Sequence, residues 1–344
     1  MQLGWISYTQ YDYQKKIENF DTRKNVEVIR DLKKENKTAY PVVSPHGLYK
    51  YEDGKTLSSL GDLLPLAGIS SVTTVFCNET GKYLIYESDE YGFHNPKNLW
   101  QRAPVDIVAL GDSFTQGACV GSDKNYVSLI RERYPLTLSL GTTGNGPLAM
   151  LAGIREYVPY LKPKVVLWFY YEQNDISEDL PIESKAPLYM RYLQDPVFSQ
   201  GLLGRQAEIN QRIKQWIDAY QGEDSIVFRM PPKTNFIGRI NVNDFVLLRR
   251  LRGSLNILIG PSREYVTLFK SVLREAKKTI GSHGGNIYVV NLPGKRRYMN
   301  FTGNFSLNLR RDRVFTVLEE LDIPVIDLDL EFGGEEDPVS NFFF

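Results

Sequence analysis

The stretch VDIVALGDSFTQG, residues 105–117, decides the fold class of this chain. Its first six residues form an apolar run, which is typical of a strand buried on both faces of a parallel sheet. The glycine-flanked GDSFTQG that follows predicts a tight turn from that strand into a helix. Ser113 would then lie at the carboxyl edge of the sheet, where open α/β folds bind ligands. The plainer alternative is a helix cap, in which Asp112 or Ser113 accepts hydrogen bonds from first-turn amides.

Strands and helices alternate along the rest of the chain. Further apolar strands are predicted at 136–140, 165–171, 286–292 and 324–328, with helices near 124–133, 148–160, 262–280 and 307–321. Alternation of this kind, with right-handed crossovers, predicts a doubly wound parallel sheet in a flavodoxin-like α/β/α sandwich.

Two regions stand outside this alternation. Residues 1–104 are mixed and irregular, and we interpret them as an N-terminal extension that contains a hairpin at 73–88. Residues 105–344 form the sandwich domain. Residues 176–260 interrupt its rhythm, and we expect them to be an insertion that folds over the carboxyl edge of the sheet.

Composition excludes several classes of protein. The chain has 344 residues, with 41 Lys and Arg against 41 Asp and Glu, so its formal net charge is zero. Nucleic-acid-binding proteins usually carry a basic excess, and we expect no nucleic-acid partner. The sequence contains no run of about 18 apolar residues, so it predicts no membrane span. The first residues lack the apolar core of a signal peptide, which leaves a cytoplasmic protein or a chain without its targeting segment.

Cysteine and histidine are scarce. Cys77 and Cys119 are too few for a disulfide scaffold or a zinc site made of cysteines alone. Two buried thiols and a single Cys77–Cys119 disulfide both remain open. Only three histidines occur, and neither Walker A nor a G-x-G-x-x-G after a strand is present. We therefore predict no metal and no cofactor.

Two later segments strengthen the interpretation of Ser113. LGTTGNGP (140–147) follows the second strand, and the glycines around Gly144 let a substrate approach backbone N–H groups. YYEQND (170–175) follows the third strand, and Asn174 can offer a side-chain N–H. Each has an ordinary alternative, as a glycine-rich connection or a turn residue. Because all three segments follow parallel strands, we expect them at one edge of the sheet.

The three blocks, in this order, resemble those of the SGNH (GDSL) hydrolase family. The resemblance covers about 105–330 and implies that Ser113 is the nucleophile. It also implies an oxyanion hole made by the Ser113 backbone N–H, Gly144 and Asn174. One departure is Glu172, which stands where the third block usually has glycine.

The surrounding sequence is similar to a bacterial SGNH subgroup of unclear substrate. The similar segments are GFHNP (92–96) and GACV (117–120). Members of this subgroup often carry an N-terminal membrane segment, so the resemblance implies a protein of the cell envelope. Membrane association would then depend on a segment that this chain does not contain, and a native N-terminus would instead indicate the cytoplasm.

The general base is missing from the sequence pattern. A serine hydroxyl needs a positioned base, usually a histidine oriented by a carboxylate. The family takes both from a late D-x-x-H block, which precedes a closing helix. The nearest match here begins at Asp337 and has Ser340 in the histidine place, shortly before Phe344. We expect the chain to end before the catalytic histidine, and loss of the closing helix would expose an apolar face.

Other residues are weaker candidates for the site. His94 lies upstream of the first sandwich strand and could fold over Ser113. His283 precedes a strand, which predicts the opposite edge of the sheet. His46 lies in a Pro/Gly turn, and we assign it no catalytic role. Asp112 and Asp175 are further candidate carboxylates beside the nucleophile and the third block.

The sequence leaves more than one function open. The first is a serine ester hydrolase that forms an acyl-Ser113 intermediate, on small-molecule or acylated envelope carbohydrate substrates by family analogy. The alternative is a catalytically degenerate hydrolase fold that binds or scaffolds a ligand. A membrane-surface role for the apolar and basic run at 245–260 is a third hypothesis, against an insertion helix that covers the sheet edge.

Overall fold

The computed structural model describes residues 19–219, 262–299, 301–335 and 337. Its central sheet has five parallel strands: β6 (Ile107–Leu110), β7 (Thr137–Ser139), β8 (Val165–Tyr171), β9 (Asn286–Leu292) and β10 (Val325–Asp327). They pair in the order β10-β9-β8-β6-β7, so that Ala109 of β6 lies opposite both Ser139 and Leu167. Numbered along the chain, the order is 2-1-3-4-5, which is the flavodoxin-like doubly wound order. The predicted fold class is confirmed.

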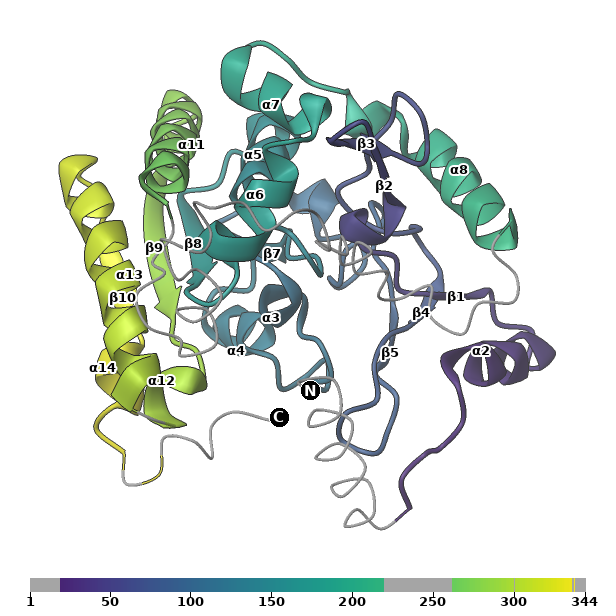
Figure 1. Cartoon of the computed structure of the whole chain (residues 1–344). Helices are drawn as coiled ribbons and strands as arrows, with labels where there is room; N and C mark the ends of the chain where they lie inside the picture. Colours follow the sequence, from purple (N-terminus) through teal and green to yellow (C-terminus); the bar gives the residue numbers. More distant parts are fainter. Residues whose placement is uncertain (1–18, 220–261, 300, 336, 338–344) are drawn as a thin grey trace.

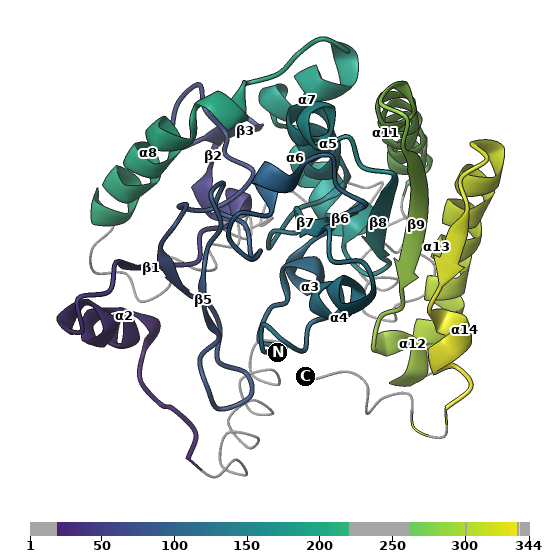
Figure 2. The ribbon, with the colours of Figure 1, turned by 180° about the vertical axis from the view of Figure 1, so that it is seen from behind.

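Helices flank both faces of this sheet (Figures 1 and 2). On one face, α5 (Pro147–Leu161), α11 (Arg263–Ser282) and α13 (Phe301–Glu320) pack over the strands. The main apolar core lies between them, with Trp168 of β8 fully buried at its centre. On the other face, α4 (Tyr126–Arg133) packs through Val127 against β6, β8 and β9.

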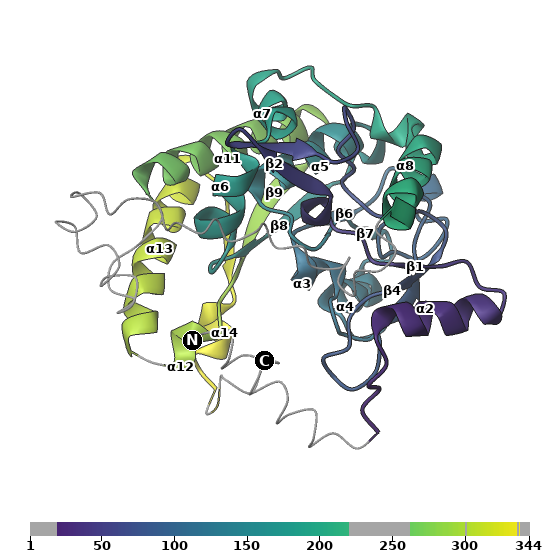
Figure 3. The same cartoon turned by 45° about the vertical axis from the view of Figure 1, so that its right-hand side comes forward.

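The N-terminal segment joins the main core and also forms small apolar clusters of its own. It contains α2 (Asn25–Lys34), a sheet of β1 (Ala39–Pro41), β4 (Thr73–Val75) and β5 (Ile85–Glu87), the turn η1 (Pro45–Leu48), a hairpin of β2 (Tyr49–Glu52) and β3 (Lys55–Ser58), and η2 (Trp100–Arg102). Strands β4 and β5 are antiparallel, as the predicted hairpin requires. Leu48 and Leu63 belong to one apolar cluster with Val108 of β6. Figure 3 shows the segment on the β7 side of the large sheet.

Between β8 and residue 219, the regular elements are helical. It forms η3 (Asp175–Asp179, a π-helical turn), α6 (Leu180–Glu183), α7 (Pro187–Gln194), η4 (Leu202–Gly204) and α8 (Gln206–Ala219). Helix α6 lies at the first turn of α5, which is the carboxyl edge of the sheet, and α7 packs along α5. The run at 245–260 lies outside the described residues.

One disulfide joins the N-terminal segment to the sandwich. Cys77, in the β4–β5 turn, bonds to Cys119 with Cα atoms 5.3 Å apart. Cys119 lies just beyond the short helix α3 (Ser113–Gln116), which begins at the candidate nucleophile. Of the two states that the sequence left open, the structure has the disulfide.

Among the described residues, no helix covers part of one sheet face. Beside α4 runs an apolar groove of about 960 Å³ over β8, β9 and β10, bounded on the far side by α14 (Asp329–Phe332). Its floor includes Leu167, Phe169, Val290 and Leu328. In the described part of the chain, no helix combines the length and apolarity needed to cross a membrane.

Candidate active site

Ser113 begins a helix directly after the first sandwich strand. Asp112 is the N-cap of α3, and its Oδ1 accepts a hydrogen bond from the Phe114 backbone N–H at 3.0 Å. A side chain on Gly111 would lie 2.0 Å from the Thr115 hydroxyl oxygen, so this turn requires glycine. Asp112 therefore provides the cap, which leaves the Ser113 hydroxyl unused. That side chain is half-buried and forms no hydrogen bond within the described part of the chain.

The second block packs against α3, the helix that begins at Ser113. A Cβ on Gly141 would lie 2.6 Å from the Gln116 backbone nitrogen, which places the loop directly on α3. The Gln116 side-chain oxygen accepts from both the N–H and the hydroxyl of Thr143. Its amide donates to the Tyr86 hydroxyl of β5 at 3.1 Å. One side chain thus connects α3, the Gly144 loop and the N-terminal sheet.

The third block contacts the first. Asn174 precedes η3, and its side-chain amide favours the ionised form of the Asp112 carboxyl, so the two groups are neighbours. The Asn174 Oδ1 atom is buried and has no partner among the described residues. A primary amide also carries two N–H donors, which a ligand can use. The carboxyl edge thus gathers the blocks of Ser113, Gly144 and Asn174.

Buried carboxyl groups surround this edge. Burial raises the pKa of Asp112 to about 6, even though the Phe114 N–H and Asn174 hydrogen bonds favour its ionised form. Burial, and then repulsion from Asp112 and Asp179, raises the pKa of Asp175 well above its ordinary value. Its Oδ2 accepts from the Tyr171 N–H at 3.1 Å. Asp175 therefore braces the turn after β8.

Glu183, whose role the sequence did not predict, binds the backbone at the end of the second block. Its carboxylate accepts from the backbone N–H groups of Gly146 and Leu148, both at 2.8 Å. These N–H groups belong to the first turn of α5, where backbone donors have no partner within the helix. A Cβ on Gly146 would lie 2.6 Å from the Asp179 Cβ, so the glycine permits this approach. Burial raises the pKa of Glu183 to about 8.

Two of the three histidines, His94 and His283, form hydrogen bonds away from Ser113. His94 packs beneath α3, where Nδ1 bonds to the Gln116 carbonyl at 2.8 Å and Nε2 to the Ser122 hydroxyl at 2.9 Å. With both ring nitrogens occupied, His94 has none left for Ser113 in this arrangement. His283 ends α11 at the amino edge of the sheet, with Nδ1 bonded to the Thr279 carbonyl. Asp337 is exposed beyond α14.

His46 is in a different position. It lies on η1, and its Cγ and Nδ1 atoms are 2.8 Å from where a Cβ of Gly144 would stand. Its Nε2 atom is buried and has no hydrogen-bond partner among the described residues. Burial lowers the pKa of His46 to about 4. The two residues lie far apart in the sequence, and no local pattern indicates their contact.

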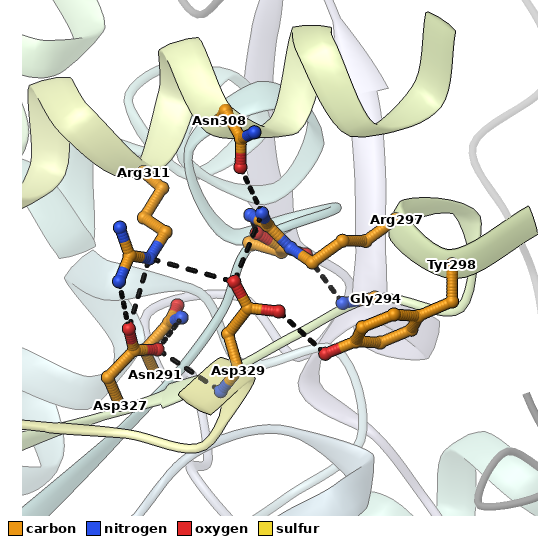
Figure 4. Close-up of polar contacts among 9 residues, drawn as sticks. Asn291, Gly294, Arg297, Tyr298, Asn308, Arg311, Asp327 and Asp329 are labelled. Carbon is orange, nitrogen blue, oxygen red and sulfur yellow. Dashed lines mark hydrogen bonds and ion pairs between the residues drawn. The ribbon is translucent and has the colours of Figure 1, made fainter. Parts of the chain in front are cut away.

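A buried ion network fixes the backbone before Asn174 (Figure 4). Glu172 and Arg297 pair with side chains 0% and 2% exposed, and Glu172 also accepts from the Gly294 N–H at 2.6 Å. Figure 4 shows Asp329 between Arg297 and Tyr298, whose hydroxyl donates to it at 2.7 Å. The residue that departs from the family pattern thus ties β8 to α12 (Arg296–Met299) and α14.

The likeness of this chain to other proteins is distant. No family model and no curated protein matches it. Solved structures similar to it include TesA, at 10% identity and a TM-score of 0.34, over 67% of this chain and 83% of that one. The acetyl xylan esterase AlAXEase has 12% identity and a TM-score of 0.33, over 69% and 80%. LAE5, an alpha/beta hydrolase from the metagenome of Lake Arreo, has 13% and 0.33, over 70% and 86%. The fold class therefore rests on the strand order and register.

Proposed function

We propose that the chain is a serine ester hydrolase of the SGNH type. The observation that carries the proposal is the meeting of three blocks at one sheet edge. The Gln116–Thr143 hydrogen bond joins the first block to the second, and the Asn174 amide neighbours the Asp112 carboxyl. Small-molecule or carbohydrate esters are the proposed substrates, on the strength of the sequence resemblance.

The proposed chemistry proceeds through an acyl-enzyme. The Ser113 oxygen attacks the ester carbonyl carbon and loses its proton, and the carbonyl oxygen becomes an oxyanion. N–H groups of Ser113, Gly144 and Asn174 stabilise that charge. The C–O bond to the alcohol then breaks, and the alcohol leaves with a proton. Water attacks acyl-Ser113 in the same way and releases the carboxylic acid.

The base is the part of this mechanism without an assigned residue. No histidine nitrogen of the described chain lies within hydrogen-bond distance of the Ser113 hydroxyl. In a serine hydrolase of unrelated fold, loss of the histidine costs ~10⁶ in kcat and leaves ~10³–10⁴ over water. We expect the 344-residue chain to acylate slowly.

Mass spectrometry of the protein after incubation with 4-nitrophenyl acetate tests the proposal. We expect an acetyl group on the peptide that contains Ser113, and none in Ser113→Ala. Ser271→Ala, on α11, is the matched control and should acetylate like the wild type. Acetylation that is equal in Ser113→Ala, or absent from Ser113 in the wild type, would reject the proposal. Ligand binding without acylation would favour the degenerate alternative.

A further inference from the structure

We infer that His46 is a substrate-contact residue of this site, and that its imidazole bonds to a polar atom of the ester held at Gly144. The inference rests on the proposed function and adds a residue from the N-terminal segment to it. It also gives that segment a role in substrate recognition.

The His46 side chain packs closely against Gly144. Besides Cγ and Nδ1, the His46 Cβ lies 3.2 Å from the position that a Gly144 Cβ would take. Gly144 has φ +80°, so a substitution there would also be strained. The imidazole therefore occupies the space where any other residue would carry its side chain. A group bound at the Gly144 N–H lies beside this ring.

The cap of η1 and the packing on Tyr49 hold the His46 ring in place. The Ser44 hydroxyl caps η1 by accepting from the Gly47 N–H at 3.2 Å. The His46 ring packs on Tyr49 with centroids 4.9 Å apart, and the Tyr49 and Tyr189 hydroxyls are 3.1 Å apart. Leu48, the next-but-one residue, is buried in the core. This packing positions the ring without satisfying its Nε2 atom.

An unsatisfied ring nitrogen at this place is informative. Most buried polar side-chain atoms in proteins have a hydrogen-bond partner. His94 follows that rule with both nitrogens, whereas Nε2 of His46 has no partner among the described residues. The pKa of each ring is lowered to about 4 by removal from water, so both are uncharged at neutral pH. The difference is that His46 adjoins a glycine of the proposed oxyanion hole.

The closing experiment uses phenylboronic acid, because a boronic acid adds to a serine oxygen and mimics the tetrahedral intermediate. With ¹³C-labelled histidine, the chain gives ring signals from three residues, and the His46 signal is assigned by its loss in His46→Gln. We expect the His46 signal to shift on titration and the His283 signal to stay. Boron NMR reports the adduct separately, and Ser113→Ala should abolish both changes.

The outcomes separate the inference from the proposed function. An adduct on Ser113 with no change at His46 overturns the inference and leaves the function standing. No adduct at all overturns both.

A rate measurement gives a second, independent reading. For acetylation of Ser113 by 4-nitrophenyl acetate, His46→Phe should be slower by about tenfold, as the loss of one hydrogen bond predicts. His46→Gln keeps a polar terminus and should recover part of the rate, while His283→Gln should match the wild type. Circular dichroism confirms that each variant folds. Acetylation of a folded His46→Phe at the wild-type rate overturns the inference.

Discussion

Gln116 accepts hydrogen bonds from both the backbone N–H and the side-chain hydroxyl of Thr143, at 2.8 and 2.7 Å. The residue three places after the candidate nucleophile is thereby fixed to the residue just before Gly144. One buried side chain therefore helps to set the relative placement of Ser113 and Gly144, together with the backbone bond from the Thr142 N–H to the Gly111 carbonyl. The Tyr86 hydroxyl accepts from the same side chain and connects the pair to β5.

Replacing Gln116 by leucine should destabilise the protein and misplace the two blocks. The change leaves the buried Thr143 N–H without its acceptor, which costs about 1–3 kcal/mol, more than the hydrogen bond itself contributes. Urea unfolding measures the free energy. Gln101→Leu, at a surface position of η2, is the matched control and should change it by less than about 0.5 kcal/mol. Equal stability of the two variants would contradict the role of Gln116.

Glu183 should make stability fall as pH rises. Burial raises its pKa from 4.5 to about 8, so the folded protein retains a proton that the unfolded chain releases in this range. Its contribution is complete below about pH 4.5 and lost as the pH approaches 8. Free energies of unfolding, measured across this window, should decline by up to about 1.4 kcal/mol per pH unit.

Glu183→Gln removes this titration and should flatten the curve, at the cost of weaker acceptance from Gly146 and Leu148. Groups such as Asp112 titrate in both proteins and cancel in the difference. Glu319→Gln, on the exposed side of α13, is the matched control. Parallel curves for wild type and Glu183→Gln would show that the carboxyl is ionised in the folded protein.

Arg297→Met should be strongly destabilising. It leaves Glu172 buried as an uncompensated charge, which typically costs about 3–5 kcal/mol. The comparison is Arg23→Met, because Arg23 pairs with Asp21 at the surface, where ion pairs contribute little to stability. Pairing Arg297→Met with Glu172→Met should restore part of the loss. A cost for Arg297→Met no greater than for Arg23→Met would contradict the structure of this network.

The uncovered sheet face should bind an apolar dye in the native state. Exposed apolar areas of this size bind probes such as anilinonaphthalene sulfonate. Ile326, on β10 and 45% exposed, lines the groove, so Ile326→Lys should lower the dye fluorescence without unfolding the protein. Val197→Lys, at an 87% exposed position outside the groove, should not change it. Equal fluorescence for both variants would place the dye elsewhere.

The sequence predicted the sheet well because its central strands are buried on both faces. Continuous apolar runs marked β8 and β9, whose bounds agree with the prediction residue for residue. Helix α13 begins at Phe301, earlier than predicted, because Gly303 and the polar residues around it hide the helical period. The sequence also predicted that the three blocks meet at one edge, since each block follows a parallel strand and parallel strands end at the same edge.

The contacts that hold the candidate site could not be predicted. Gln116–Thr143, Glu183–Gly146 and His46–Gly144 each join segments that are distant in the sequence. Periodicity reports which face of an element is buried, but it says nothing about which loop meets which. For the same reason the sequence left the state of Cys77 and Cys119 open.

The Cys77–Cys119 bond also closes a covalent ring, since the two cysteines are 42 positions apart and Ser113 lies between them. A single cut of the backbone inside this ring cannot release a fragment, because the two new ends remain joined through sulfur. Ser113 would stay attached to both halves of a nicked molecule. Electrophoresis of a nicked sample would then show one band without reductant and two with it.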